Sequence, residues 1–500
     1  MKTHLEFNVM EYGAHGDGVH HDGAAISAAI AACHAAGGGK VIVPSGTYLT
    51  GPIVLCNNLN LHIEAGATVL FSRDFKEYPL VITPYEGKQT VACRSPLWGE
   101  GLKNISITGG GTFDGQGDAW RPIYRFHFSE SEWRSMLPDY GIVDERRGIW
   151  WPSEDAMKGE PVVKQLRKQS GSPHIEDYSV AHDYLRPSLV KLINCKNVLL
   201  DGPTFQNSPT WNIHIVFCRD VKVQNISVFN PWYAPNGDGI DIESCRNVEI
   251  CDCFLDVGDD AICLKSGKGP EALRRAQPCE NILIKGCTVL HGHGGVTVGS
   301  ETSGGIHNVK VWDCVFRGTD VGVRFKTCRG RGGVVKDIDI RNLTMSNITG
   351  AAISFDMFYN GSSWHEDTHL NAPEPLHQPV SIETPEFHDI TISDVSCRGA
   401  ALAIEVHGLP EMPIKNIHLE NLEIESRRGI VLRQAKNVAL DKVTVSVGKL
   451  PSLDSHNVTG LVISDFNGHN PAEAKKEEKL VLSTESFVSS AKAVLNGAGH

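Results

Sequence analysis

Apolar and polar residues alternate along most of this chain in short runs that recur. The commonest phrase is a polar residue followed by alternating aliphatic positions, as in KNVLLDGPTF, RDVKVQNISV, RNVEICDCFL and ENILIKGCTV. Nine anchor residues open such phrases at intervals of 21 to 34 residues, apart from one interval of 52: Asn197, Asp220, Asn247, Asn281, Asn308, Asp337, Asp389, Asn416 and Asn437. Alternation with a period of two is typical of β-strands, and a repeat of this length is typical of one coil of a solenoid.

A second phrase, with aliphatic residues on either side of a variable one, follows the anchors. Examples are Ile240-Asp241-Ile242, Ile262-Cys263-Leu264, Val296-Thr297-Val298 and Val323-Arg324-Phe325. We expect the aliphatic side chains to point into the coil and the residue between them to point outward, because successive side chains of a strand alternate. The two phrases together predict an all-β fold, a right-handed, single-stranded parallel β-helix.

Several segments depart from the repeat. Residues 22–38, DGAAISAAIAACHAAGG, have helical spacing and are predicted to form a helix that ends near Gly37 and caps the N-terminal end of the core. The repeat is lost between about residues 119 and 187, which are rich in aromatic and charged residues. This segment is predicted to be an ordered insertion that either covers the surface of the solenoid or forms a wall at one end of a cleft. The 52-residue interval leaves room for a second insertion around residues 357–379. We expect residues 1–466 to form a single β-helix domain and residues 467–500 to form a charged tail leading into a helix.

Composition and charge narrow the class of protein. The chain has 500 residues, 41% of them hydrophobic, with 50 glycines and 7% aromatic residues, which favours many short strands around a large core. A net charge of −12 argues against a general nucleic-acid or membrane binder. The N-terminus has no apolar core of a signal peptide, so we expect a cytoplasmic protein, the alternative being a secreted or periplasmic protein whose signal peptide has been removed. The oligomeric state is left open.

The fourteen cysteines include no CxxC pair, and Cys251 and Cys253 fall in an alternating strand pattern. Buried free thiols are therefore expected there, with no metal site. No cofactor is predicted.

Five aspartates stand close together in APNGDGIDIESCRNVEICDCFLDVGDDAICLKSG: Asp238, Asp241, Asp256, Asp259 and Asp260. Asp238 and Asp260 each precede the first aliphatic of the second phrase by two residues, so they are expected to stack on neighbouring coils. Asp259 and His293 each precede it by three and are expected to stack as well. Two carboxylates on adjacent strands, about 4.8 Å apart, repel each other, and this repulsion costs folding free energy. Such a pair is therefore expected where the carboxylates have a function.

Basic residues share this surface in the predicted register. Arg324 falls in the outward column of Asp241, and Lys326 lies two residues further on the same face. A ladder of aspartates that bind turn amides is the structural alternative. The coincidence of acids, a histidine and two cations in one register favours a site instead.

Two or three carboxylates without a pair of metal-binding histidines fit hydrolysis of a glycosidic bond, which needs a proton donor and a carboxylate that activates water. Arg324 and Lys326 suit a carboxylate on the sugar, so the predicted substrate contains a uronic acid, as pectin does.

At these residues the chain resembles glycoside hydrolase family 28, the polygalacturonase family. The four motifs of that family occur in order as Asn236-Gly237-Asp238, Gly258-Asp259-Asp260, Gly292-His293-Gly294 and Arg324-Phe325-Lys326. The resemblance covers residues 6 to about 446, and HDYLRPSLVKLINCKNV with the insertion before it is similar to the bacterial exo-acting branch. One departure is Gly237, where the family often has threonine.

The resemblance implies a pectin-lyase-like solenoid and an inverting hydrolase of α-1,4-linked galacturonide oligosaccharides. It implies Asp259 as general acid, Asp238 and Asp260 as the carboxylates that hold the nucleophilic water, and His293 as the residue that tunes Asp259. Arg324 and Lys326 are implied to grip the galacturonate carboxylate. Tyr359 matches a tyrosine of the family that contacts substrate.

Exo-action is expected if the insertion walls off the cleft beyond the terminal sugar. Three alternatives stay open: a hydrolase of rhamnogalacturonan or a decorated galacturonan, a calcium-dependent pectate lyase, and a non-catalytic β-helix that binds carbohydrate.

Overall fold

The computed structural model describes residues 5–169, 171–359, 376–471 and 480–482. The chain divides into two compact units, Met1–Asp259 and Asp260–His500. Both are built from stacked parallel strands, which confirms the parallel β-helix predicted from the repeat. The expectation of one domain over residues 1–466 stays a prediction.

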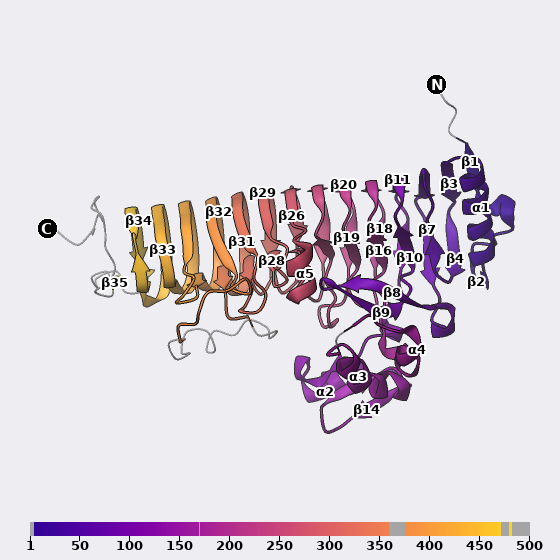
Figure 1. Cartoon of the computed structure of the whole chain (residues 1–500), viewed down its shortest axis with the longest axis horizontal. Helices are drawn as coiled ribbons and strands as arrows, with labels where there is room; N and C mark the ends of the chain where they lie inside the picture. The colour runs from indigo at the N-terminus through magenta and orange to yellow at the C-terminus, as the bar shows by residue number, and fades with distance from the viewer. Residues whose placement is uncertain (1–4, 170, 360–375, 472–479, 483–500) are drawn as a thin grey trace. The chain divides into compact units, whose positions relative to one another are not determined.

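The first unit contains three ladders of parallel strands, and each regular coil contributes one strand to each ladder (Figure 1). The first ladder consists of β1 (Glu6–Asn8), β3 (Gly39–Val43), β6 (Leu59–Ile63), β11 (Lys103–Gly109), β17 (Lys196–Asp201), β20 (Arg219–Gln224) and β23 (Arg246–Cys251). The second consists of β2 (Asp17–His21), β4 (Gly46–Thr50), β7 (Ala67–Phe71), β12 (Thr112–Asp114), β18 (Thr204–Gln206), β21 (Ser227–Phe229) and β24 (Phe254–Asp256). The third consists of β5 (Ile53–Val54), β10 (Leu97–Glu100), β16 (Val190–Ile193), β19 (Ile213–Val216) and β22 (Ile240–Glu243).

Aliphatic residues in register fill the interior of these coils. One column of the first ladder runs through Val41, Leu61, Ile107, Leu200, Val223 and Ile250, all of them buried. Because the strands are parallel and in register, each coil places the same kind of side chain above that of the previous coil.

The nine anchor residues share one backbone conformation. Asn197, Asp220 and Asn247 are the second residues of β17, β20 and β23 in the first ladder, and the other six lie on strands of the second unit. All nine have φ between +54° and +58°, a left-handed conformation that Asn and Asp tolerate better than other residues with a side chain. Their amides also bond from coil to coil, as in Asn247 Nδ2 to Asp220 Oδ1 at 2.9 Å. The polar anchors of the repeat are therefore turn residues.

Helix α1 (Gly23–Ala35) caps the N-terminal end of the first unit, as predicted. It packs against β1, β3, β5 and β6 through a buried face that includes Ile26, Ala29, Ile30 and Cys33. Gly37, with φ of +87°, follows the helix and turns the chain toward β3.

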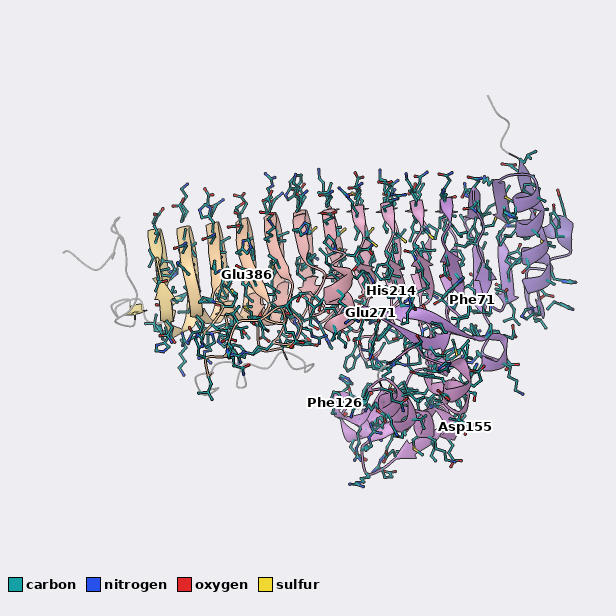
Figure 2. The ribbon with its side chains drawn as sticks, viewed as in Figure 1. Phe71, Phe126, Asp155, His214, Glu271 and Glu386 are labelled. Carbon is teal, nitrogen blue, oxygen red and sulfur yellow. The ribbon has the colours of Figure 1, made fainter. Side chains whose placement is uncertain are left out.

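The predicted insertion is ordered and lies to one side of the coils of the first unit (Figure 1). Phe126 and Asp155 lie on it, whereas Phe71 and His214 lie on the coils (Figure 2). Its elements, with the hairpin that precedes it and the short 3-10 helices of the unit, are β8 (Leu80–Tyr85), β9 (Lys88–Cys93), β13 (Ile123–Tyr124), α2 (Glu130–Met136), β14 (Ile142–Asp144), β15 (Ile149–Trp151), α3 (Glu154–Leu166), α4 (Ile175–Tyr178), η1 (Val9–Tyr12), η2 (Phe75–Glu77), η3 (Gly117–Ala119), η4 (Arg125–His127) and η5 (Ser179–Tyr184).

The hairpin β8–β9 anchors this insertion. Tyr78 and Trp120 meet edge to face with ring centroids 5.2 Å apart, and Val91 of β9 and Val163 of α3 are buried in the same cluster. The sequence pattern did not predict this hairpin.

The second unit contains both short strands and the longest strands of the chain, β29, β31, β32 and β33. Its elements are β25 (Ile262–Lys265), α5 (Gly269–Arg275), β26 (Cys279–Lys285), β27 (Thr288–Val289), β28 (Val296–Gly299), β29 (Ile306–Arg317), β30 (Val323–Lys326), β31 (Val334–Asp356), β32 (Glu386–His407), β33 (Ile414–Thr459), β34 (Val462–His469) and β35 (Leu480–Leu482). Val296, Val323, Ile353 and Ile404 form an in-register buried column.

The structure also bears on the cysteines, on membrane-spanning helices and on the C-terminal tail. The fourteen cysteines form no disulfide in the part of the chain that the structure describes, and eleven of them are buried. Cys253 is buried as predicted, whereas Cys251 is only partly buried. Within the described residues, no helix is long and apolar enough to cross a membrane. Of the expected C-terminal tail the described part is small, and Leu480–Leu482 pair with Leu453–Ser455 as a strand. The rest of that tail, and residues 360–375 of the second insertion, lie outside the described residues.

Candidate active site

The first unit brings Asp238 and Asp259 together. One carboxylate oxygen of each lies within 4.8 Å of the other. Asp238 is 3% exposed and stands two residues before β22, whereas Asp259 is partly exposed. The chain path holds Asp238 in place, because its carbonyl accepts a 2.9 Å hydrogen bond from the Asn212 amide on the preceding coil.

Glycines shape the two loops that carry these acids. A Cβ at Gly258 would come within 2.5 Å of the Pro231 carbonyl and 2.8 Å of the Ala234 carbonyl. A Cβ at Gly237 would lie 2.8 Å from the Ala234 Cβ. The Ala234 carbonyl oxygen would lie 2.9 Å from the same Cβ at Gly237. A side chain at either position would therefore require the loop to shift.

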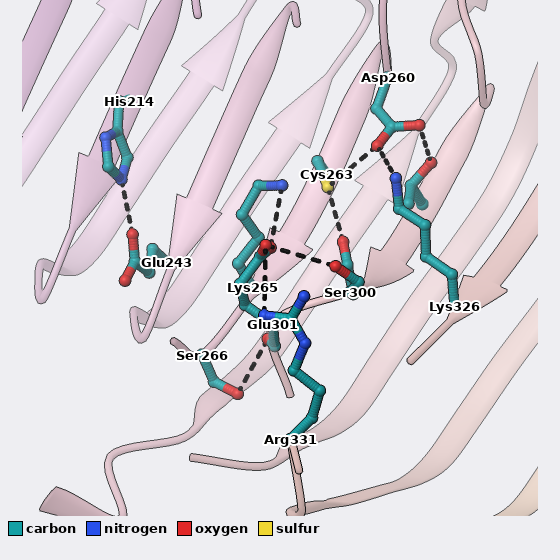
Figure 3. A network of polar contacts seen from close by, with 12 residues as sticks. His214, Glu243, Asp260, Cys263, Lys265, Ser266, Ser300, Glu301, Lys326 and Arg331 are labelled. Atoms are coloured by element: carbon teal, nitrogen blue, oxygen red, sulfur yellow. Dashed lines mark hydrogen bonds and ion pairs between the residues drawn. The ribbon is translucent and has the colours of Figure 1, made fainter. Parts of the chain in front are cut away.

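The column expected to face outward is buried in the first unit. Lys191, His214 and Asp241 pair in register on β16, β19 and β22 and are all at most 3% exposed. His214 Nε2 lies 2.9 Å from Glu243 Oε2 (Figure 3). Lys191 Nζ donates to the Pro84 carbonyl at 2.6 Å, so the hairpin β8–β9 covers this column.

The second unit holds Asp260 against two cations. Lys326 Nζ lies 2.6 Å from Asp260 Oδ2 (Figure 3). Arg324 Nη1 lies 3.7 Å from Asp260 Oδ1. Thr297 Oγ1 donates to Oδ1 at 2.9 Å. Burial disfavours the charged form of Lys326, but the attraction of Asp260 outweighs it and raises the Lys326 pKa.

Tyr359 lies against the same cations. Its ring centroid is 4.9 Å from Lys326 Nζ and 5.5 Å from Arg324 Cζ. Both cations are only 5% exposed, so the aromatic face and the Asp260 carboxylate share the work of compensating two buried charges.

His293 lies in the loop before β28. Its Nε2 is 3.8 Å from Asp320 Oδ2, and its side chain is 30% exposed. The glycine after it is required, because a Cβ at Gly294 would lie 2.2 Å from Thr297 Oγ1 and 3.1 Å from Asp260 Oδ1. The Gly292-His293-Gly294 motif thus lets the chain pass close to Asp260.

A second buried ion pair lies in the same unit. Lys265 Nζ and Glu301 Oε2 are 3.2 Å apart, and Arg331 Nη1 is 4.0 Å from Glu301 Oε1 (Figure 3). Burial opposes ionisation of Glu301, but Lys265 and three further cations lower its pKa to about 2. Glu301 therefore offsets a concentration of positive charge in this unit.

The structure brings together two groups of the expected site residues. Asp238 lies near Asp259. Asp260 pairs with Arg324 and Lys326, and these two cations lie over the ring of Tyr359. Asp259 and Asp260 are successive residues of the chain. The stacking of Asp238 on Asp260 and of His293 on Asp259 stays a prediction.

Two polar partners were missed as site residues. Thr297 was recognised only as a member of the outward column, and nothing in the sequence marked Asp320 as a neighbour of His293. Both contacts join different coils, so only the register of the folded strands reveals them.

Two protein-family models match parts of the sequence. The description "Glycosyl hydrolases family 28" matches residues 179–372, which include all seven expected site residues. The description "Rhamnogalacturonase A/epimerase, pectate lyase-like" matches residues 6–71, which include none of them.

Similar proteins extend these matches. A "Probable polygalacturonase" of Vitis vinifera is 30% identical over 395 residues, covering 78% of this chain and 67% of that protein. An "Exo-poly-alpha-D-galacturonosidase" of Dickeya chrysanthemi is 29% identical over 412 residues, covering 80% of this chain and 64% of that protein. The solved structure of a "hyperthermoactive Exopolygalacturonase" from Thermotoga maritima has a TM-score of 0.69 at 28% identity and covers 93% of this chain and 92% of that one. By these shared lengths and its four motifs, the chain belongs to glycoside hydrolase family 28, the polygalacturonase family.

Proposed function

We propose that this chain hydrolyses α-1,4 linkages between galacturonate units of pectin oligosaccharides, starting from chain ends. The observation that carries the proposal is the buried Asp260 held by Lys326 and Arg324, two cations that also lie over the ring of Tyr359. A carboxylate with these partners is suited to binding water, and the two cations are suited to the carboxylate of a uronic acid. The similarity to proteins described as polygalacturonases supports the same substrate.

In this proposal Asp259 is the general acid that protonates the leaving glycosidic oxygen. Asp238 and Asp260 orient the water that attacks the anomeric carbon, and one of them takes its proton as the bond to the leaving sugar breaks. His293 tunes the protonation of Asp259. Arg324, Lys326 and Tyr359 bind the galacturonate unit on the leaving side.

Inversion at the anomeric carbon is the expected outcome, although the acids are close. The oxygens of Asp238 and Asp259 lie within 4.8 Å, less than the roughly 6.5–9.5 Å that usually separates the acid and base of inverting enzymes. We assign inversion because two carboxylates are available to hold a water that attacks directly. Proton NMR of the first product decides this point: inversion of an α linkage releases the β-anomer, and initial release of the α-anomer contradicts the assignment.

The test of the function uses galacturonate oligomers of defined length, incubated with the protein in the presence of a chelator, with products separated over time. Release of galacturonic acid one unit at a time supports exo-action and the insertion as a wall. Mixed oligomers indicate an open cleft and endo-action. Loss of cleavage when the chelator is added indicates a calcium-dependent lyase. If no cleavage occurs even without the chelator, rhamnogalacturonan and decorated galacturonans are tested next, and failure to cleave those indicates a binding function.

The state of the cysteines is relevant to the cellular compartment in which the protein acts. All fourteen are free thiols, which is typical of a reducing compartment. We propose that the protein degrades imported oligogalacturonides in the cytoplasm, the alternative being secretion or export to the periplasm with removal of a signal peptide. Cell fractionation distinguishes the two.

A further inference from the structure

A cavity of about 100 Å³ lies within the first unit, beside the loop that carries Asp238. Its walls come from the hairpin β8–β9, from the end of the inserted segment and from coil strands, and Asn236 is one of its lining residues. A space of this size holds several water-sized groups, enough for a carboxylate and the adjoining part of a sugar ring.

Three basic side chains line the cavity. Arg167, Arg186 and Lys191 are among its lining residues, all of which are described, and none of the lining residues is Asp or Glu. Arg186 Nη1 donates to the carbonyls of Pro209 at 3.0 Å and Pro235 at 2.9 Å, and its Nη2 donates to Asn236 Oδ1 at 3.2 Å. These acceptors are all neutral.

Lys191 has a similar environment. Its Nζ is 2.6 Å from the Pro84 carbonyl and 2.6 Å from His214 Nδ1. Burial lowers the Lys191 pKa to about 7 in spite of the attraction of Glu243 and Asp241. An anion that enters the cavity would therefore favour the protonated, charged form of Lys191.

Two hydroxyl groups in the same cavity lack partners. Thr83 and Thr90 face each other in register on β8 and β9, and both line the cavity. They are 4% and 2% exposed, and the Oγ1 of each has no hydrogen-bond partner in the described residues. Buried hydroxyls are normally bonded, so two such groups at one cavity indicate a polar ligand.

We propose that this cavity binds the carboxylate and neighbouring hydroxyl of the terminal, non-reducing galacturonate, the unit that exo-action releases. The inference rests on the proposed function. The unit whose anomeric carbon is attacked lies on the side of the water-holding Asp238, and Arg186 joins the cavity to Asn236, two residues before it. Arg186 and Lys191 supply charge-assisted hydrogen bonds, while Thr83 and Thr90 recognise hydroxyls.

The test measures binding without turnover. In an Asp259→Asn background, calorimetry compares trigalacturonate with a trisaccharide whose non-reducing unit is galactose and with one whose reducing-end unit is galactose. The Lys191→Met change is expected to weaken binding of trigalacturonate and of the reducing-end analogue about tenfold or more. Binding of the non-reducing-end analogue is expected to stay unchanged. Lys196→Met, an exposed cation on β17, is the matched control and alters none of the three.

Thr83→Val and Thr90→Val keep the shape of the wall and remove no existing bond, so they test the cavity without a folding defect. They are expected to weaken trigalacturonate binding severalfold. Equal weakening of all three ligands by Lys191→Met, or wild-type binding by both threonine variants, overturns the inference. Because these measurements need no cleavage, an inactive wild-type protein that still discriminates the analogues refutes the proposed function and retains the cavity as a uronate site.

Discussion

Replacing Glu301 by Gln removes a buried negative charge without changing the shape of the side chain. Glu301 is 5% exposed and bonds to Lys265, with Arg331 at the edge of ion-pair distance. Its pKa falls from the ordinary 4.5 to about 2 because Lys265 and three other cations outweigh the effect of burial. A fall of this size corresponds to about 3 kcal/mol of folding free energy at neutral pH, to order of magnitude.

The pH dependence follows from the direction of that shift. Since the folded pKa lies below the unfolded one, the stabilisation is fully present above pH 4.5 and is lost as the pH falls through about 2. We therefore expect Glu301→Gln to lower the free energy of unfolding by about 3 kcal/mol at pH 7, and by progressively less below pH 4.5.

Urea unfolding followed by tryptophan fluorescence and circular dichroism at pH 7, 5 and 3 measures this difference. Glu423→Gln, an exposed carboxylate on β33, is the control and is expected to change stability by at most about 0.5 kcal/mol. A Glu301→Gln protein as stable as wild type at pH 7, or one whose deficit is the same at pH 3, refutes the reasoning.

Three further predictions concern the site. Asp259→Asn is expected to fold normally, with an unchanged circular dichroism spectrum, and to lose nearly all hydrolysis of galacturonate oligomers; wild-type turnover contradicts its role as the acid. Lys326→Met removes the 2.6 Å partner of Asp260 and is expected to lower kcat/KM about tenfold to a hundredfold, with Lys285→Met, an exposed lysine, as the control; equal kinetics of the two variants argues against a substrate-binding Lys326. Gly237→Thr forces a Cβ to 2.8 Å from that of Ala234 and is expected to reduce both thermal stability and activity, and a variant as stable and active as wild type shows that the loop has room for the threonine of the family.

The repeat in the sequence is enough to predict the coiled architecture. The anchors recur because a left-handed corner in each coil accepts Asn or Asp, and the columns of aliphatic residues follow from the period of two. Asp238, Asp259, Asp260, Arg324 and Lys326 could be predicted as site residues because their places were counted from the nearest aliphatic residue of the repeat. The contact of Asp260 with Lys326, 66 residues apart in sequence, agrees with that count.

The segments that cover the coils could not be predicted from the repeat, because their positions depend on tertiary packing. Lys191 meets Pro84 across 107 residues, and the cavity beside Asn236 needs the hairpin, the insertion and the coils at once. No local period encodes these contacts, because they depend on how aromatic side chains such as Tyr78 and Trp120 pack. Local repeats fix the register of stacked strands, whereas the docking of an inserted segment is set by the shape and burial of side chains distant in the chain, and this docking is what closes the charged cavity next to the loop of Asp238.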